Sequence, residues 1–410
     1  MYLRRCIPLA ALFISVLFLS SCGSGPKTPK KAITIWLVGS EAQARTINGL
    51  SRAFTESTGY TVDCQAISWG NAHSKYLTSI AGEVTPDIGT MGLTWGMEFG
   101  ELGAMLDLRE RFPEDVAVLE NKNFPGLVES TRIGTKVYGV PFDLSEHIMF
   151  YRKDMIPEPP DSWESLMAVL KDLKSRGKGM VIDLGSLDWI GFSPFLWQAG
   201  GDYFSKGYDS ITLNSSEGAK ALGFFGSLYS EGVPKTQVPI EQGMRTGDYP
   251  LAISGNWKIT SMTLSAPEIS GKWGIAMLPK GPSGKRTAFV GGRIMGIFKR
   301  SMNAPVAWEF IKFLSSPDIQ KKLYQASIET EDSYLPPNMD TWRDLPMDDN
   351  FKNVLEMQAK ESKGPPPVLG WDSMTRFVNH AIQRVILQKA DPAAELDKAV
   401  KGMREEFKTV

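Results

Sequence analysis

The chain has 410 residues, of which 42% are hydrophobic and 22% are charged, as in an ordinary globular protein long enough for two domains. Lysine and arginine together number 45, and aspartate and glutamate together number 46, so the charges nearly cancel. This balance argues against a nucleic acid as partner and against a polybasic segment that binds membrane surfaces.

Residues 1–21 are expected to be a signal peptide and not part of the fold. Arg4 and Arg5 precede an almost unbroken apolar run over residues 7–19, which small residues follow. The run is shorter than the roughly 20 residues that a membrane-spanning helix needs, so an uncleaved anchor is the less favoured alternative. The sequence therefore predicts export.

The motif Leu19-Ser20-Ser21-Cys22 resembles the lipobox of bacterial lipoproteins. The resemblance implies that Cys22 is acylated and holds the protein at the periplasmic or extracellular side of a membrane, with residues 22–31 as a flexible tether. A chance cysteine near an ordinary cleavage site is the alternative. Only Cys64 then remains in the body of the chain, which excludes an internal disulfide and favours a buried thiol over a catalytic one.

The first third of the remaining chain alternates between strand and helix patterns. Strands are expected at residues 32–37, 62–67 and 86–91. Helices are expected from Ser40 to Gly59, over 73–81 and over 95–106. Alternation of this kind predicts a parallel sheet covered on both faces.

Helices recur through the rest of the chain. Ser162 and Ser215 are predicted N-caps of helices that end at Gly177 and Gly232. An apolar stripe over residues 307–314 contains Trp308, which is expected in the core. Three more helices are predicted, beginning after Ser316 and covering 374–387 and 393–407.

Motifs for chemistry are absent from the sequence. The histidines at 73, 147 and 380 have no metal-ligand spacing, and no serine-hydrolase, metalloprotease or dinucleotide-binding motif occurs. Residues 281–286 lack the spacing of a phosphate-binding loop and are expected to form a surface turn. We therefore expect no cofactor and no metal, and a binding protein more than an enzyme. A glycosidase stays open, because it needs only two carboxyl groups brought together by the fold.

Several segments in a fixed order carry a resemblance that spans Ile33 to about Lys401. They are Ile33-Thr34-Ile35-Trp36 with Gly39-Ser40-Glu41, Pro86-Asp87-Ile88 with Met91 to Trp95, Pro141-Phe142-Asp143 with Phe150 to Asp154, Gln198 to Asp202, Ile253-Ser254-Gly255-Asn256-Trp257, Val290-Gly291-Gly292-Arg293, and Trp308 to Pro317. In this order they resemble family-1 extracellular solute-binding proteins of ABC importers, the relatives of maltose-binding protein.

The resemblance implies a periplasmic-binding-protein-like fold of type II, with two discontinuous α/β lobes joined by hinge crossings. The N-terminal lobe would comprise residues 32–143 and 295–337, and the C-terminal lobe 144–294 and 338–410. Crossings are expected near residues 143–147, 290–295 and 335–338. A ligand would bind between the lobes, at the carboxyl ends of strands.

The aromatic content favours a sugar, because flat rings stack on the apolar faces of sugar rings while polar groups bind the hydroxyls. The chain has 11 tryptophans. The resemblance implies Trp95, Trp257 and Trp371 as the stacking residues, and Trp36, Trp69 and Trp189 are second candidates. The predicted polar and main-chain contacts are Asp143, Arg293, Glu41, Ser40, Asn256, Gly292 and His73. Core packing is the alternative for each tryptophan, and a hinge or surface salt bridge for each charged residue.

The resulting hypothesis is a monomeric, lipid-anchored protein that binds a carbohydrate and delivers it to a two-subunit permease with its ATPase. A second hypothesis keeps the fold but changes the cargo to another solute, and Arg293 would suit an acidic one. A third is a lipid-anchored glycosidase with Glu41 and Asp143 as its carboxyl pair.

Overall fold

The computed structural model describes residues 31–183, 187–330 and 332–407. The predicted signal peptide and Cys22 lie outside these described residues. Within them, no helix is both long enough and apolar enough to cross a membrane.

The first lobe is built on a five-stranded sheet with the order β2-β1-β3-β12-β6. Strand β1 runs parallel to β2 and β3, whereas β12 is antiparallel to β3 and β6. The strands are β1 (Ala32–Val38), β2 (Thr61–Ile67), β3 (Ile88–Gly92), β6 (Val140–Pro141) and β12 (Arg293–Ile297). A separate hairpin consists of β4 (Arg132–Ile133) and β5 (Lys136–Val137).

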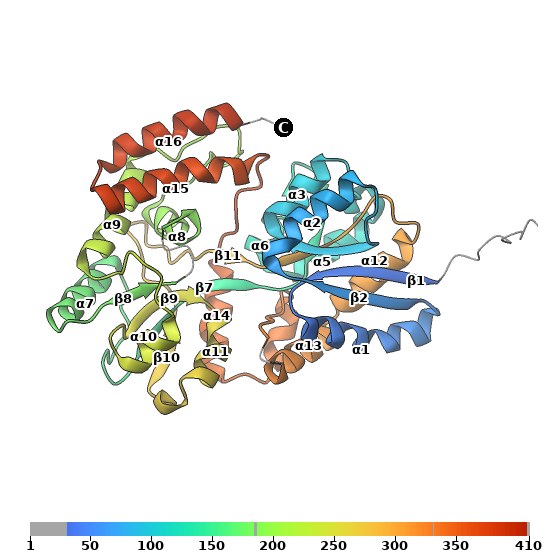
Figure 1. Cartoon of the computed structure of the whole chain (residues 1–410), viewed down its shortest axis with the longest axis horizontal. Coiled ribbons are helices and arrows are strands. Elements are labelled where there is room, and N and C mark those ends of the chain that lie inside the picture. The colour runs from blue at the N-terminus through green and yellow to red at the C-terminus, as the bar shows by residue number, and fades with distance from the viewer. Residues whose placement is uncertain (1–30, 184–186, 331, 408–410) are drawn as a thin grey trace, which may run out of the picture. The chain divides into compact units, whose positions relative to one another are not determined.

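Helices surround this sheet (Figure 1). They are α1 (Glu41–Thr58), α2 (Trp69–Ala81), α3 (Leu93–Glu101), α4 (Leu108–Arg111), α5 (Pro113–Lys122), α6 (Pro125–Glu129), α12 (Ala304–Leu314), α13 (Pro317–Glu329) and the 3-10 helix η2 (Met339–Asp344).

Local signals place the ends of these helices. The Ser40 hydroxyl accepts a hydrogen bond from the Gln43 N–H at 3.1 Å, and Gly59 ends α1 in the left-handed conformation, with φ of 74°. Helix α3 ends at Glu101, five residues earlier than the pattern predicted, because the chain turns at Gly103 with φ of 73°. The expected core position of Trp308 is confirmed by its 1% exposure.

The second lobe has a sheet with the order β10-β7-β9-β8, and β11 also pairs with β7. Its strands are β7 (Ser145–Arg152), β8 (Met180–Ile182), β9 (Leu251–Gly255), β10 (Trp273–Ala276) and β11 (Val290–Gly291). Its helices are α7 (Trp163–Ser175), α8 (Trp189–Ala199), α9 (Ser216–Glu231), α10 (Ile240–Thr246), α11 (Lys258–Ser265), η1 (Pro267–Ile269), α14 (Asp349–Lys360), α15 (Trp371–Gln388) and α16 (Pro392–Glu406).

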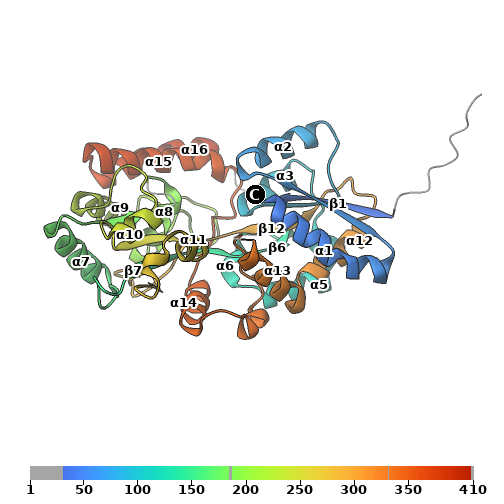
Figure 2. The same ribbon diagram turned by 60° about the horizontal axis from the view of Figure 1, so that its bottom comes forward.

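Two hydrophobic cores stabilise this arrangement. One contains residues of the first lobe together with residues of β7, α10, α11 and α14, so it continues through the crossing onto one face of the second sheet. The other lies on the opposite face of the second sheet, beneath α7, α8, α9, α15 and α16. Figures 1 and 2 both show α15 and α16 on one side of the second sheet. In both views α2 and α3 lie on the same side of the first sheet.

Two segments connect the sheets directly. The chain leaves the first sheet at β6 and enters the second at β7, and it returns from β11 to β12 through Gly292. A third segment lies beside them, where the Leu144 N–H donates to the Leu335 carbonyl at 2.9 Å. The two-lobed α/β fold is thus confirmed, while the exact division of the lobes at residues 143, 294 and 337 stays a prediction.

A buried ion pair joins the two direct crossings. The Asp143 carboxylate accepts from the Arg293 N–H at 2.7 Å and from Nε at 2.9 Å, and it also pairs with Nη2. The Arg293 Nη1 donates to Gln43 Oε1 at 2.7 Å and to the Val38 carbonyl. Gly292 has φ of 130°, and a Cβ there would overlap the Asp143 main chain. The pair therefore connects β12, the crossing, β1 and α1.

We predict that Asp143→Asn lowers the free energy of unfolding by about 3–5 kcal/mol, because it leaves the Arg293 guanidinium buried without a counter-charge. Equilibrium urea unfolding measures this change. Asp172→Asn is the matched control, since the Asp172–Arg176 pair is exposed and its loss costs less than about 1 kcal/mol. A loss at Asp143 as small as that of the control would contradict the assignment.

Candidate functional site

The carboxyl ends of strands from both sheets meet at the crossing. Gly92, at the end of β3, lies opposite Arg293 at the start of β12. Gly255, at the end of β9, lies opposite His147 near the start of β7. Open α/β sheets bind ligands beyond such strand ends, so the residues that follow β2, β3, β8 and β9 form the candidate site.

Three aromatic rings of the first lobe gather beyond β2 and β3. The Trp95 ring lies 5.7 Å from the Trp69 ring and 5.1 Å from the His73 ring. Trp69 is 50% exposed, so a large part of its indole is available for contact. His73 Nε2 lies 2.6 Å from Glu98 Oε2, so a polar pair borders the indoles. Of the predicted site residues, the structure thus brings Trp69, Trp95 and His73 together.

A carboxyl group from the second lobe lies beside this cluster. Asp372 is in the first turn of α15, and its carboxyl group lies near enough to Thr94 and Glu98 of α3 for both to affect its pKa. Loss of hydration next to the other lobe raises the pKa of Asp372, the nearby Glu98 raises it further, and Thr94 and His73 act in the opposite direction. Asp372 nevertheless keeps exposed surface. Polar groups from both lobes therefore face one another here.

Trp257 supplies the corresponding ring of the second lobe. It directly follows Asn256 at the end of β9, and its side chain is partly exposed. A Cβ on Gly255 would overlap the six-membered ring of Trp257, so the indole lies directly against the main chain of β9. Glycine at 255 is what permits this close approach.

Two other predicted tryptophans lie deeper in the second lobe. Trp189, the first residue of α8, is partly exposed and packs edge-on against Phe289 at 5.4 Å and Trp371 at 5.1 Å. Trp371 is only 2% exposed and also contacts Tyr203 at 4.7 Å. In this structure Trp371 is a core residue that lies behind Trp189.

Trp36 lies within β1 and not beyond its end. It pairs with Gln65 and Gly89 on the neighbouring strands, and its ring lies 5.6 Å from the Tyr76 ring of α2. Lys75 Nζ lies 4.4 Å from the Trp36 ring centre. Trp36 therefore packs against α2 on one face of the first sheet.

The predicted polar residues have mainly structural contacts. Asp143, Arg293 and Gly292 belong to the buried network of the crossing. The Asn256 side chain accepts from the Glu146 N–H at 2.7 Å, which holds the loop after β9 against β7. Ser40 caps α1 and donates to Asp332.

Glu41 differs from this group because it is exposed in the first turn of α1. Among the predicted polar side chains, Glu41 is exposed, His73 and Ser40 are partly exposed, and Asp143, Arg293 and Asn256 are buried.

Sequence reasoning did not identify a charged cluster beside Trp257. Lys258 Nζ lies 3.0 Å from Glu241 Oε1 and 3.4 Å from Asp183 Oδ2, and Asp183 also accepts from the Ser254 hydroxyl at 3.0 Å. Asp183 immediately follows β8, as Trp257 and Lys258 follow β9, so the positions after strand ends could have revealed it. Glu98, Thr94 and Asp372 were also missed, because only the fold brings α3 and α15 together.

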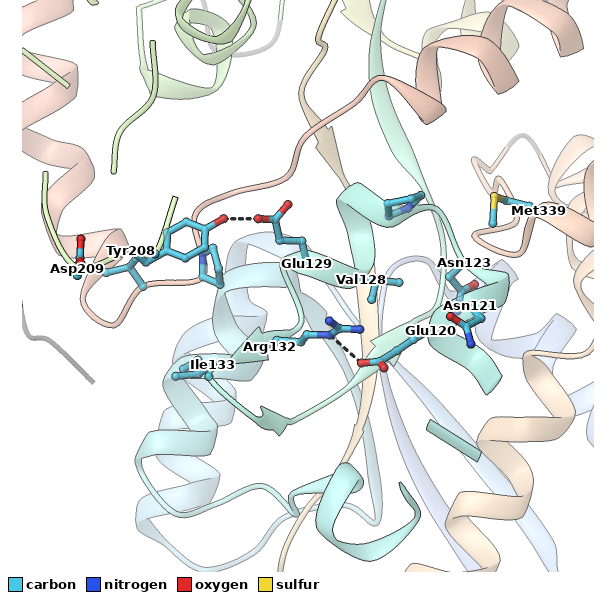
Figure 3. A pocket seen from close by; sticks show the side chains of 15 residues that line it. Glu120, Asn121, Asn123, Val128, Glu129, Arg132, Ile133, Tyr208, Asp209 and Met339 are labelled. Carbon is cyan, nitrogen blue, oxygen red and sulfur yellow. Dashed lines mark hydrogen bonds and ion pairs between the residues drawn. The ribbon is translucent and has the colours of Figure 1, made fainter. Parts of the chain in front are cut away.

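A cavity of about 820 Å³ lies elsewhere, between α5, α6 and the loop that contains Tyr208 (Figure 3). Its acidic groups already have partners, since Glu120 accepts from Arg132 Nε at 2.8 Å and Glu129 accepts from the Tyr208 hydroxyl. None of the predicted ligand residues lines it. We favour the site around Trp69, Trp95 and Trp257, because its accessible rings lie beyond the ends of strands. The cavity does not combine these two features.

Neither a metal site nor an active thiol is evident in residues 31–183, 187–330 and 332–407. No group of three or more His, Cys, Asp or Glu side chains there is arranged to hold a metal ion. Cys64 is buried in β2, and burial raises the pKa of its thiol to about 12, so the group stays protonated and unreactive at neutral pH.

Known proteins share this architecture. The family model of bacterial extracellular solute-binding proteins matches residues 49–344. The chain is 23% identical to a putative binding protein of Brucella abortus, over 85% of this chain and 87% of the relative. It is 24% identical to the galactooligosaccharide-binding protein of Bacillus subtilis, over 68% of each chain.

A solved structure agrees with the family match. The sugar-binding protein MalE of Xanthomonas citri superposes with a TM-score of 0.81 and 25% identity, covering 91% of this chain and 96% of that one. The family model covers well over half of the sequence, and the fold agrees across both lobes. The chain is a member of the bacterial extracellular solute-binding protein family.

Proposed function

We propose that this protein binds a carbohydrate between its lobes, with Trp95 and Trp69 of the first lobe and Trp257 of the second as the stacking surfaces. The observation that carries the proposal is the position of these accessible indoles beyond strand ends that converge on one crossing. Each ring stacked on a sugar face would contribute about 0.5–1.5 kcal/mol beyond area burial.

Polar groups beside the rings suit the hydroxyl rim of a sugar. His73 lies next to Trp95 and pairs with Glu98, and Asp372 lies near both polar groups. Lys258 and Asp183 follow strands of the second lobe. Carboxylates accept hydrogen bonds from hydroxyls, and ammonium groups donate to them. The two sides together offer both donors and acceptors to one ligand.

The names of relatives support a sugar of modest size. One relative is the galactooligosaccharide-binding protein of Bacillus subtilis, and another is the lactose-binding protein of Rhizobium radiobacter, which is 26% identical over 51% of this chain. We therefore propose a mono- or small oligosaccharide. The contacts of Trp371 and Trp189 suggest that they support the site from behind and do not stack on the ligand.

Transport without chemistry is the proposed role. The lobes would close around the sugar by a hinge motion at the crossing, and the closed form would be recognised by an ABC permease with its ATPase. A relative in Deinococcus radiodurans is named a probable ABC transporter-binding protein. A monomer anchored through acylated Cys22 fits this role.

The two alternatives differ in what supports them. A glycosidase using Glu41 and Asp143 is disfavoured, because both Asp143 oxygens are occupied by Arg293 in the crossing. A non-sugar solute in the same site is the remaining alternative. Since the Arg293 guanidinium is also occupied, it no longer favours an acidic cargo.

We predict that a thermal-shift screen with glucose, galactose, maltose, lactose and raffinose raises the melting temperature for at least one sugar. At a hundredfold excess over Kd, binding stabilises by about 2.7 kcal/mol, or about 3 °C for a chain of this length. Spermidine, glycerol phosphate and a tripeptide test the other cargoes. Shifts with one of these and none with any sugar would replace the carbohydrate proposal.

We predict that Trp257→Ala removes most of the sugar-induced shift while the unliganded melting curve stays cooperative, because the ring is partly exposed and its loss leaves no core cavity. Isothermal titration should show affinity at least about tenfold lower. Trp273→Phe is the control, since Trp273 packs on Phe150 and Phe351 in the same lobe. Unchanged affinity in Trp257→Ala would remove Trp257 from the site.

A further inference from the structure

His147 lies at the edge of the candidate site but is assigned no role by the arguments above. It pairs with Gly255 across the antiparallel strands β7 and β9. Directly opposite residues in an antiparallel pair project their side chains from the same face of the sheet. The Trp257 ring occupies the space where a Gly255 side chain would begin. The His147 imidazole therefore projects from the face that carries the Trp257 indole.

The imidazole is enclosed by apolar and aromatic groups. His147 is 1% exposed, and its ring lies 5.7 Å from the Phe289 ring, which in turn contacts Trp189 at 5.4 Å. Within the described part of the chain, neither Nδ1 nor Nε2 has a hydrogen-bond partner. Most buried polar atoms are paired, because leaving one unpaired is costly, so two such atoms on one ring require an explanation.

The charge state of the ring matches a hydroxyl group. Burial lowers the pKa of His147 to about 4, so the imidazole is neutral at pH 7. A neutral imidazole has one N–H donor and one acceptor nitrogen. A sugar hydroxyl both donates and accepts, so two adjacent hydroxyls could satisfy the two nitrogens, whereas an ammonium or carboxylate ligand would offer only one kind of partner.

We propose that His147 is a carbohydrate-recognition residue that hydrogen-bonds ligand hydroxyls through its two unpartnered ring nitrogens. The inference rests on the proposed carbohydrate function and deepens it, because it specifies a neutral, hydroxyl-bearing ring near β7. His147 is buried, so access requires a side chain next to it, such as Phe289 or Trp257, to shift. Trp257 would then stack on the same sugar whose hydroxyls His147 binds.

Variants separate this role from a structural one. His147→Phe removes both polar nitrogens and keeps an aromatic ring, and His147→Gln keeps one donor and one acceptor. Titration with the sugar that gives the largest thermal shift should show His147→Phe binding about tenfold or more weakly, with His147→Gln between it and the wild type. The unliganded melting temperature of His147→Phe should be equal or higher, since two unpaired polar atoms are removed.

The exposed His380 provides the matched control, and His380→Phe should bind like the wild type. Equal affinity of wild type and His147→Phe, with a raised melting temperature in the variant, would show that His147 is only a buried structural residue. A wild type that binds none of the sugars would instead overturn the carbohydrate function itself.

A measurement on the wild type avoids reliance on the folding of variants. The chain has three histidines, so ¹⁵N-labelled imidazole signals can be assigned by single substitutions at 73 and 380. Addition of the bound sugar should shift both ring nitrogen signals of His147. If the sugar binds and these signals stay unchanged, the proposal is wrong.

Discussion

The buried pair between Arg293 and Asp143 is the contact on which the rest of the arrangement depends. The Arg293 guanidinium also binds the Val38 carbonyl and Gln43. This one side chain therefore connects the start of β12 to the end of β1 and to α1. A buried ion pair brings little net stability unless its hydrogen bonds are satisfied, but losing one partner is expensive. Because the loss of either partner is destabilising, the pair keeps the two crossings together. The strand ends of both sheets meet beside these crossings.

The two lobes present different surfaces where their strand ends converge. The first lobe presents accessible rings, Trp69 and Trp95, with a histidine–glutamate pair at their border. The second lobe presents Trp257 against the main chain of β9, and its Trp189 packs on the buried Trp371. Trp69 and Trp95, whose rings already contact each other, lose little freedom on binding, which favours affinity. Asp372 already places one polar group of the second lobe beside the first.

Local rules in the sequence predicted much of the fold, because caps, glycines and apolar stripes act over a few residues. Ser40, Gly59 and Trp308 all have the roles that their spacing indicates. The site was harder to predict from the sequence, since the neighbours of a side chain depend on segments far away along the chain. Trp36 fits the alternating pattern of a strand, and only the position of α2 shows that its ring packs against Tyr76. Thr94 and Asp372 are 278 positions apart, so nothing local could pair them. The sequence placed His147 at the end of a predicted crossing and showed no metal-ligand spacing, but its missing partners are visible only in three dimensions.

A crystal structure of the protein with its best-binding sugar tests the central claim most directly. The account predicts that one sugar ring stacks on Trp257 and that the same ligand contacts Trp95 or Trp69 of the first lobe. A sugar bound in the cavity beside Tyr208 and Glu129, with all three indoles free of ligand, would contradict it.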